Sequence, residues 1–74
     1  MAEKIFDLRG LRCPLPVLRT RKALAGSATG DILIVACTDP LAGIDIPHLL
    51  QETGDTLEET RHDARVTTFR IRKG

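Results

Sequence analysis

Apolar residues along the chain gather in short runs, and two of these runs have the character of buried strands. Residues 31–37 are apolar at nearly every position and rich in β-branched side chains, which is typical of a central strand with little exposed surface. Residues 5–8 form a shorter run of the same kind, which ends in a turn with the sequence Arg-Gly-Leu at 9–11. We therefore expect two strands here, the second at the centre of a sheet.

The last third of the chain carries a different pattern, which predicts an edge strand followed by a half-buried strand. Residues 56–61 contain one large apolar side chain beside two glutamates, and such charges protect the exposed edge of a sheet. A turn is expected at residues 62–64. In residues 66–72 the side chains of Thr67, Phe69 and Ile71 should point to one side. This alternation is typical of a strand with one buried face.

The first helix is expected between the first two strands. It should begin at Pro14 with Cys13 as its N-cap, because proline is favoured in a first turn, where its missing N–H breaks no hydrogen bond. Gly26 or Gly30 should end it. The residues at helical spacing that we expect to be buried are Val17, Leu18, Leu24 and Ala25.

A second helix is expected between the central strand and the edge strand. Asp39 and Pro40 open a turn, and Pro47 argues against one continuous helix from that point. We therefore expect the helix to begin at Asp45, which caps it, and to end at Gly54. Its apolar face should consist of Ile46, Leu49 and Leu50.

These elements follow one another in the order βαβαββ, which predicts an α+β fold. Strand–helix–strand connections are right-handed and make the first two strands parallel, while the last two strands form an antiparallel hairpin. The expected architecture is a two-layer α/β sandwich, in which a four-stranded mixed sheet carries both helices on one face. A chain of 74 residues is expected to form a single domain, residues 1–74.

Composition narrows the classes of function. A net charge of +1, with Phe6 and Phe69 as the only aromatic residues, argues against direct nucleic-acid binding through phosphate contacts or base stacking. No apolar run approaches the roughly 20 residues of a membrane span, and no secretory signal is recognisable, so we expect no membrane contact and a cytoplasmic protein with reduced cysteines. His48 and His62 have no partner at ligand spacing, and neither a metal nor another cofactor is expected.

A lone cysteine follows the first predicted strand in the sequence Arg-Cys-Pro-Leu-Pro. At a helix N-terminus the backbone N–H groups and the helix dipole stabilise a thiolate, and Arg9 and Arg12 are expected to lower the pKa of Cys13 further. Pro14 and Pro16 make the following backbone rigid and should hold the sulfur outward. Since α/β sheets place their working groups at the carboxyl ends of parallel strands, we expect Cys13 to be an exposed and reactive thiol.

Several motifs spread along the chain carry a resemblance to a known family. They are Leu11-Arg-Cys-Pro-Leu-Pro16, Arg21-Lys22, Gly30-Asp31, Thr38-Asp39-Pro40, Asp45-Ile46-Pro47 and Ile71-Arg-Lys-Gly74. In this order and spacing they resemble the TusA-like sulfur-carrier family, also called SirA/YedF-like. The resemblance implies that Cys13 carries sulfur as a persulfide. The sulfur would come from a cysteine desulfurase or a rhodanese-type donor and pass to an acceptor protein, in tRNA thiolation, molybdenum-cofactor supply or sulfur oxidation.

Other charged residues are candidates for contact with partner proteins. They are Arg19, Arg21, Lys22 and Asp39. Arg21 lies within the expected apolar stripe, where it either extends to solvent, contacts a partner, or pairs with Asp39 or Asp45. Both aspartates are most simply explained as caps of turns or helices.

Two further classes of function stay open at this point. A thiol redox enzyme would need Cys37 as its resolving cysteine, because the chain lacks a Cys-x-x-Cys motif. The simpler expectation for Cys37, at the end of the central strand, is a buried and inert side chain. A regulatory module would bind partners through the arginine-rich patch around Cys13, and its function would survive replacement of the cysteine.

Overall fold

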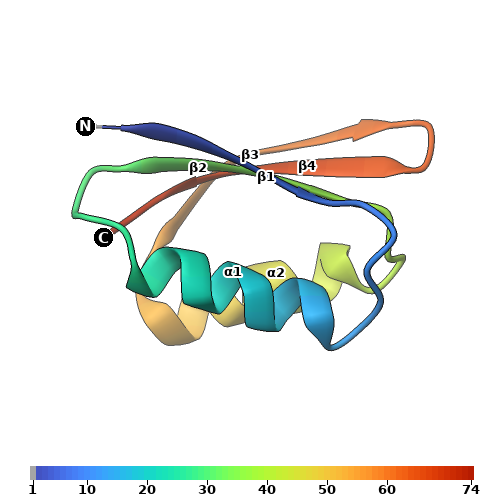
Figure 1. Ribbon diagram of the computed structural model, residues 1–74, viewed down its shortest axis with the longest axis horizontal. Helices are drawn as coiled ribbons and strands as arrows, with labels where there is room; N and C mark the ends of the chain where they lie inside the picture. Colours follow the sequence, from blue (N-terminus) through green and yellow to red (C-terminus); the bar gives the residue numbers. More distant parts are fainter. Residues whose placement is uncertain (1) are drawn as a thin grey trace.

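The computed structural model describes residues 2–74 and contains six elements in the order expected from the sequence. These are β1 (Glu3–Leu8), α1 (Leu15–Ala25), β2 (Ile32–Cys37), α2 (Ala42–Thr53), β3 (Thr56–Asp63) and β4 (Val66–Arg72). The strands form one mixed sheet, and both helices cover the same face of it, which confirms the predicted two-layer sandwich (Figure 1). Neither helix in residues 2–74 is long and apolar enough to cross a membrane.

The sheet has the strand order β1-β2-β4-β3, so the last strand of the chain lies inside it. β1 runs parallel to β2, with Leu8 opposite Cys37, and β4 is antiparallel to both β2 and β3. The hairpin thus inserts β4 beside β2 and leaves the charged β3 at the edge, as expected. The hairpin turn falls at Ala64 and Arg65, one or two residues later than predicted.

The core lies between the sheet and the helices. Leu33 and Val35 of β2, with Phe69 and Ile71 of β4, are fully buried. The alternation predicted for β4 is confirmed. In β2 only every second side chain is buried, and the others, such as Ile34, stay half-buried, because no helix or strand within residues 2–74 covers the second face of the sheet.

Helix α1 begins one residue later than expected. Pro14 occupies the N-cap position and makes no side-chain cap, so the prediction that Cys13 caps the helix is wrong. The peptide bond between Cys13 and Pro14 is cis. Cys13 therefore belongs to the loop between β1 and α1.

The buried face of α1 also differs from the predicted one. It consists of Pro16, Thr20 and Leu24, which follow one another at intervals of four residues. Leu18 is 52% exposed, and Ala25 is exposed as well. The prediction is confirmed for Leu24 and in part for Val17, which is half-buried against the core, and is wrong for the other two residues. The pattern misses the full stripe because its middle is occupied by the polar residue Thr20.

Helix α2 begins three residues before Asp45, its predicted start. Leu41 is the N-cap, and Pro47 lies inside the helix. Pro47 is the sixth residue of the helix and lacks the N–H that would bond to the carbonyl of Gly43. The burial of Ile46, Leu49 and Leu50 on either side of it holds the helix together across this position. The end at Gly54 is confirmed, with a left-handed φ of 80° that favours glycine. The predicted apolar face, Ile46, Leu49 and Leu50, is buried.

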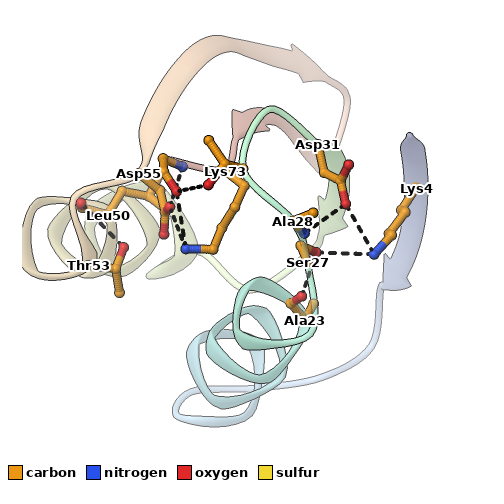
Figure 2. Close-up of polar contacts among 11 residues, drawn as sticks. Lys4, Ala23, Ser27, Ala28, Asp31, Leu50, Thr53, Asp55 and Lys73 are labelled. Atoms are coloured by element: carbon orange, nitrogen blue, oxygen red, sulfur yellow. Dashed lines mark hydrogen bonds and ion pairs between the residues drawn. The ribbon is translucent and has the colours of Figure 1, made fainter. Parts of the chain in front are cut away.

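The end of the sheet that carries both chain termini is held by two buried carboxylates, the first of which is Asp31 (Figures 1 and 2). It accepts hydrogen bonds from the N–H groups of Ala28, at 3.0 Å, and Ala2, at 3.1 Å. The Lys4 ammonium lies 3.5 Å away. The backbone N–H groups and the Lys4 charge hold the pKa of Asp31 below its ordinary value.

The second carboxylate, Asp55, joins the end of α2 to the C-terminal residues. Its Oδ1 accepts a hydrogen bond of 2.8 Å from the Gly74 N–H and lies 3.4 Å from the Lys73 ammonium (Figure 2). Burial by itself raises the pKa of Asp55, but the hydrogen bonds and the Lys73 charge outweigh it, and the net pKa is lowered.

We predict that Thr20→Val stabilises the protein by about 1 kcal/mol. The Thr20 hydroxyl is buried and has no hydrogen-bond partner in residues 2–74, and valine replaces it with a methyl group of similar size. The measurement is urea unfolding, with the exposed Thr56→Val as the control. A loss of stability would show that the hydroxyl is hydrogen-bonded after all.

We also predict that stability falls below about pH 4. Asp31 and Asp55 have lowered pKa values in the folded state, so their contribution is present above the unfolded pKa of about 3.9 and is lost as the pH falls through the folded values. Urea unfolding at neutral and acidic pH measures the loss. The loss should shrink in Asp31→Asn and Asp55→Asn but not in the exposed Asp63→Asn. If acidification lowers the unfolding free energy of both variants as much as that of the wild type, these carboxylates do not cause the loss of stability.

Candidate functional site

Three segments meet at the end of the sheet opposite the chain termini (Figure 1). They are the loop after β1 (residues 9–14), the loop after β2 (residues 38–41) and the turn between β3 and β4 (residues 64–65). The first two follow the carboxyl ends of parallel strands, which is the edge where α/β sheets place their working groups. Cys13 lies in the first of these loops.

Asp39 holds the backbone of Cys13 in place. Its Oδ2 accepts a hydrogen bond of 2.6 Å from the Cys13 N–H, and its Oδ1 accepts one of 3.1 Å from the Leu41 N–H. A second link runs from the Gly10 N–H to the Thr38 hydroxyl at 2.8 Å. Hydrogen bonds to a carboxylate are among the stronger ones in proteins, so the loop after β2 determines where Cys13 lies.

The thiol of Cys13 is exposed, as expected, but its electrostatic surroundings differ from the prediction. Its Sγ donates a hydrogen bond of 3.4 Å to Oδ2 of Asp45, in the first turn of α2. This hydrogen bond, partial desolvation and the negative charges of Asp45 and Asp39 raise the pKa of Cys13. The expectation of a lowered pKa is therefore wrong, and the resting group is a thiol.

Arg9 is engaged by Asp7. Its Nε and one terminal nitrogen donate to the two carboxylate oxygens of Asp7, each at 2.8 Å. These hydrogen bonds, with one from the Arg9 N–H, lower the pKa of Asp7 to about 2. In residues 2–74 Arg9 has no polar contact with Cys13, and its predicted role beside a persulfide stays a prediction.

The other predicted site residues lie in different surroundings. Arg12 and Pro14 are exposed next to Cys13, whereas Pro16 lies on the buried face of α1 and acts in packing. Arg21 pairs with Glu52 of α2 at 3.4 Å, and neither Asp39 nor Asp45 is its partner. Arg19 and Lys22 are exposed on α1. Partner binding by Arg19, Arg21, Lys22 and Asp39 stays a prediction.

An open groove of about 780 Å³ lies beside Cys13. It is lined by residues 10–13, by residues 38–41 and by Arg65 from the hairpin turn. On its other side Cys13 borders a smaller recess of about 230 Å³ with Asp45 and Glu52 in its wall. The thiol can therefore be approached from two sides that differ in charge.

Cys37 has the properties of a core side chain. It is fully buried at the end of β2, as the simpler expectation had it. Burial, with the nearby charge of Asp39, raises the pKa of its thiol to about 11. Such a thiol is slow to form a thiolate, which argues against a resolving role.

The sequence analysis missed two residues of this site. The sequence predicts Asp45 only as a cap or as a partner of Arg21, because its hydrogen bond to the Cys13 thiol depends on where α2 packs. Arg65 gave no signal in the sequence, because only the antiparallel pairing of β3 with β4 brings the hairpin turn to the edge where Cys13 lies.

Comparison with known proteins confirms the resemblance seen in the motifs. The family described as Sulfurtransferase TusA matches residues 4–73. The sulfur carrier protein TusA of Allochromatium vinosum is 37% identical over 68 residues, which cover 92% of this chain and 90% of that protein. YrkI of Bacillus subtilis is 36% identical over 73 residues, covering 99% and 97%. The crystal structure of the SirA-like protein from Desulfitobacterium hafniense superposes with a TM-score of 0.83 at 26% identity, covering 96% and 97% of the two chains.

We predict that Asp45→Asn lowers the pKa of Cys13. The substitution removes the negative charge that favours the protonated thiol and keeps the size of the side chain. The pH dependence of alkylation by iodoacetamide measures the thiol pKa. Glu59→Gln, which makes the same charge change on the edge strand, should leave it unchanged. An unaltered or higher pKa in Asp45→Asn would contradict the assignment of Asp45.

Proposed function

The chain belongs to the sulfurtransferase TusA family, and on that premise we propose that it carries sulfane sulfur as a persulfide on Cys13. The placement of Cys13 supports this most directly. Its thiol is exposed, is not in a disulfide, and lies in a loop that Asp39 holds at the carboxyl edge of the sheet. Transfer between thiols requires that two proteins reach one sulfur atom in turn, and no enclosed cavity is needed.

The proposed reaction is thiol exchange in two steps. The Cys13 thiolate attacks the outer sulfur of the donor persulfide, a new S–S bond forms at Cys13, and the donor leaves as a thiolate that takes up a proton. An acceptor thiolate then attacks the outer sulfur on Cys13. The S–S bond to Cys13 breaks and Cys13 leaves as a thiolate, so neither step consumes an external oxidant or reductant.

Asp45 affects both steps through the proton on Cys13. In the free carrier it favours the thiol, so less thiolate is available for uptake of sulfur. A thiolate of higher pKa is the stronger nucleophile but the poorer leaving group. Asp45 therefore restrains both uptake and release until a partner alters the surroundings of Cys13.

The partners proposed for this chain follow from its family. The donor is a cysteine desulfurase or a rhodanese-type protein, and the acceptor is a protein of tRNA thiolation, molybdenum-cofactor supply or sulfur oxidation. We propose that the whole chain acts as one carrier domain in the cytoplasm, since a reducing compartment keeps an exposed thiol free. The redox alternative has no support from Cys37, which is buried with a pKa of about 11.

We predict that Cys13→Ala abolishes sulfur loading. After incubation with a cysteine desulfurase and cysteine, intact-mass analysis should show one added sulfur atom on the wild type and none on the variant. Cys37→Ala is the matched control and should load as the wild type does, because Cys37 is buried. Loading of Cys13→Ala to the wild-type level would overturn the proposed function.

A further inference from the structure

Some lysines and arginines of this protein form ion pairs with carboxylates, and others do not. Of the eleven lysines and arginines, seven lie within 4 Å of a carboxylate in the described part of the chain. The four without such a partner there are Arg12, Arg19, Lys22 and Arg65. Two of these four, Arg12 and Arg65, line the groove beside Cys13.

The uncovered face of the sheet shows the opposite arrangement. There Arg70 pairs with Glu3 and Glu58, Arg72 pairs with Glu58, and Arg61 pairs with Glu59. Basic side chains on that face have acidic neighbours within the chain. Of the four cations without a carboxylate partner in residues 2–74, two therefore lie beside the thiol, two lie on α1, and none lies on the uncovered face.

The groove also combines charge with apolar surface. Leu11 and Pro40 lie in its wall, and Leu41, which is 49% exposed, lines it from the start of α2. Two more exposed apolar side chains, Leu15 and Ile44, belong to the first turns of the helices at this same end of the sheet. An apolar centre with charged groups around it is the usual composition of a protein-binding surface.

Charge also distinguishes the two approaches to the thiol. The smaller recess is lined by Arg21 and His48 as well as by two carboxylates. Arg21 is already paired with Glu52, so an incoming anion meets Asp45, which has no cation within 4 Å in residues 2–74. In the groove it meets Arg12 and Arg65. Asp39 lines the groove as well, but both of its oxygens accept backbone hydrogen bonds.

We propose that this groove is the docking site for the sulfur donor, and that it takes an extended acidic segment of the donor that carries the persulfide. The proposal rests on the proposed function of Cys13. Arg12 and Arg65 recognise the negative charge of the segment, and the apolar wall packs against it. The donor is assigned to this site because it meets Cys13 as the free thiol that the structure describes, whereas the acceptor meets the loaded persulfide.

The volume of the groove agrees with such an occupant. About 780 Å³ is within the range of about 300–1,000 Å³ that is usual for ligand clefts, and it is open along the surface, as a short peptide segment requires. Arg65 lies in an exposed turn, so its replacement leaves the core untouched.

Arg65→Glu tests the proposal. The rate of loading of Cys13 is measured against the concentration of a cysteine desulfurase supplied with cysteine, at about 0.15 M salt, where charges farther apart than about 8 Å are largely screened. We expect the half-saturating donor concentration to rise about tenfold or more, because reversal of a charge places like charges together in the complex. At saturating donor the variant should still gain one sulfur atom on Cys13.

Arg61→Glu is the matched control, with the same change of net charge on the edge strand, and its half-saturating concentration should change by less than about twofold. The docking site is overturned if Arg65→Glu leaves the half-saturating donor concentration unchanged, or if Arg61→Glu raises it equally. Either result leaves the proposed function standing. Failure of the proposed function would appear separately, as sulfur loading of Cys13→Ala.

Loading from a second sulfur source shows whether the arginines recognise a segment of the donor protein or only the negative charge on the sulfur. Inorganic polysulfide can load an exposed thiol without docking, so Arg65→Glu should load from it at nearly the wild-type rate. If polysulfide and desulfurase are slowed by the same factor, the arginines act on the sulfur anion alone and the proposal of a bound protein segment is wrong.

Discussion

The parallel pairing of β1 with β2 is the constraint on which the placement of the functional groups depends. Because Leu8 lies opposite Cys37, the loops that follow the two strands leave the sheet side by side. Asp39 can then bind the Cys13 N–H at 2.6 Å, and Asp45 can reach the thiol from the first turn of α2. A shift of register by one residue would reverse the faces of β1 and separate these groups.

Apart from Arg21-Lys22, which lies within α1, the motifs that carry the family resemblance divide between the two ends of the sheet. Those at residues 11–16, 38–40 and 45–47 surround Cys13, whereas Gly30-Asp31 and the C-terminal residues hold the opposite end (Figure 2). Buried or partly buried aspartates lie at both ends, and their neighbours decide how each one affects protonation there. Asp31 is stabilised as an anion by backbone N–H groups and a lysine, while Asp45 faces a thiol whose proton it retains.

Elements, order and layers could be predicted from the sequence, because runs and alternation of apolar residues report directly on burial. The prediction starts α2 too late because proline inside a helix is unfavourable locally, whereas the packing of Ile46, Leu49 and Leu50 on the core outweighs the effect of Pro47. The partners of the arginines could not be predicted. Arg21 meets Glu52 from the other helix, and such pairs depend on tertiary positions that local patterns do not contain.

An exposed thiol that serves as a carrier has to react with its donor and with little else. For each unit by which Asp45 raises the pKa of Cys13, the thiolate fraction at neutral pH falls about tenfold, whereas the nucleophilicity of each thiolate rises only about threefold. In the proposed carrier, a raised pKa of Cys13 thus makes the free thiol less reactive towards stray electrophiles than an ordinary thiol. Selectivity must then come from docking, because holding two sulfur atoms in contact raises their effective concentration far above that in solution. In the proposed carrier, the surface around Cys13, more than the sulfur itself, determines which protein exchanges sulfur with it.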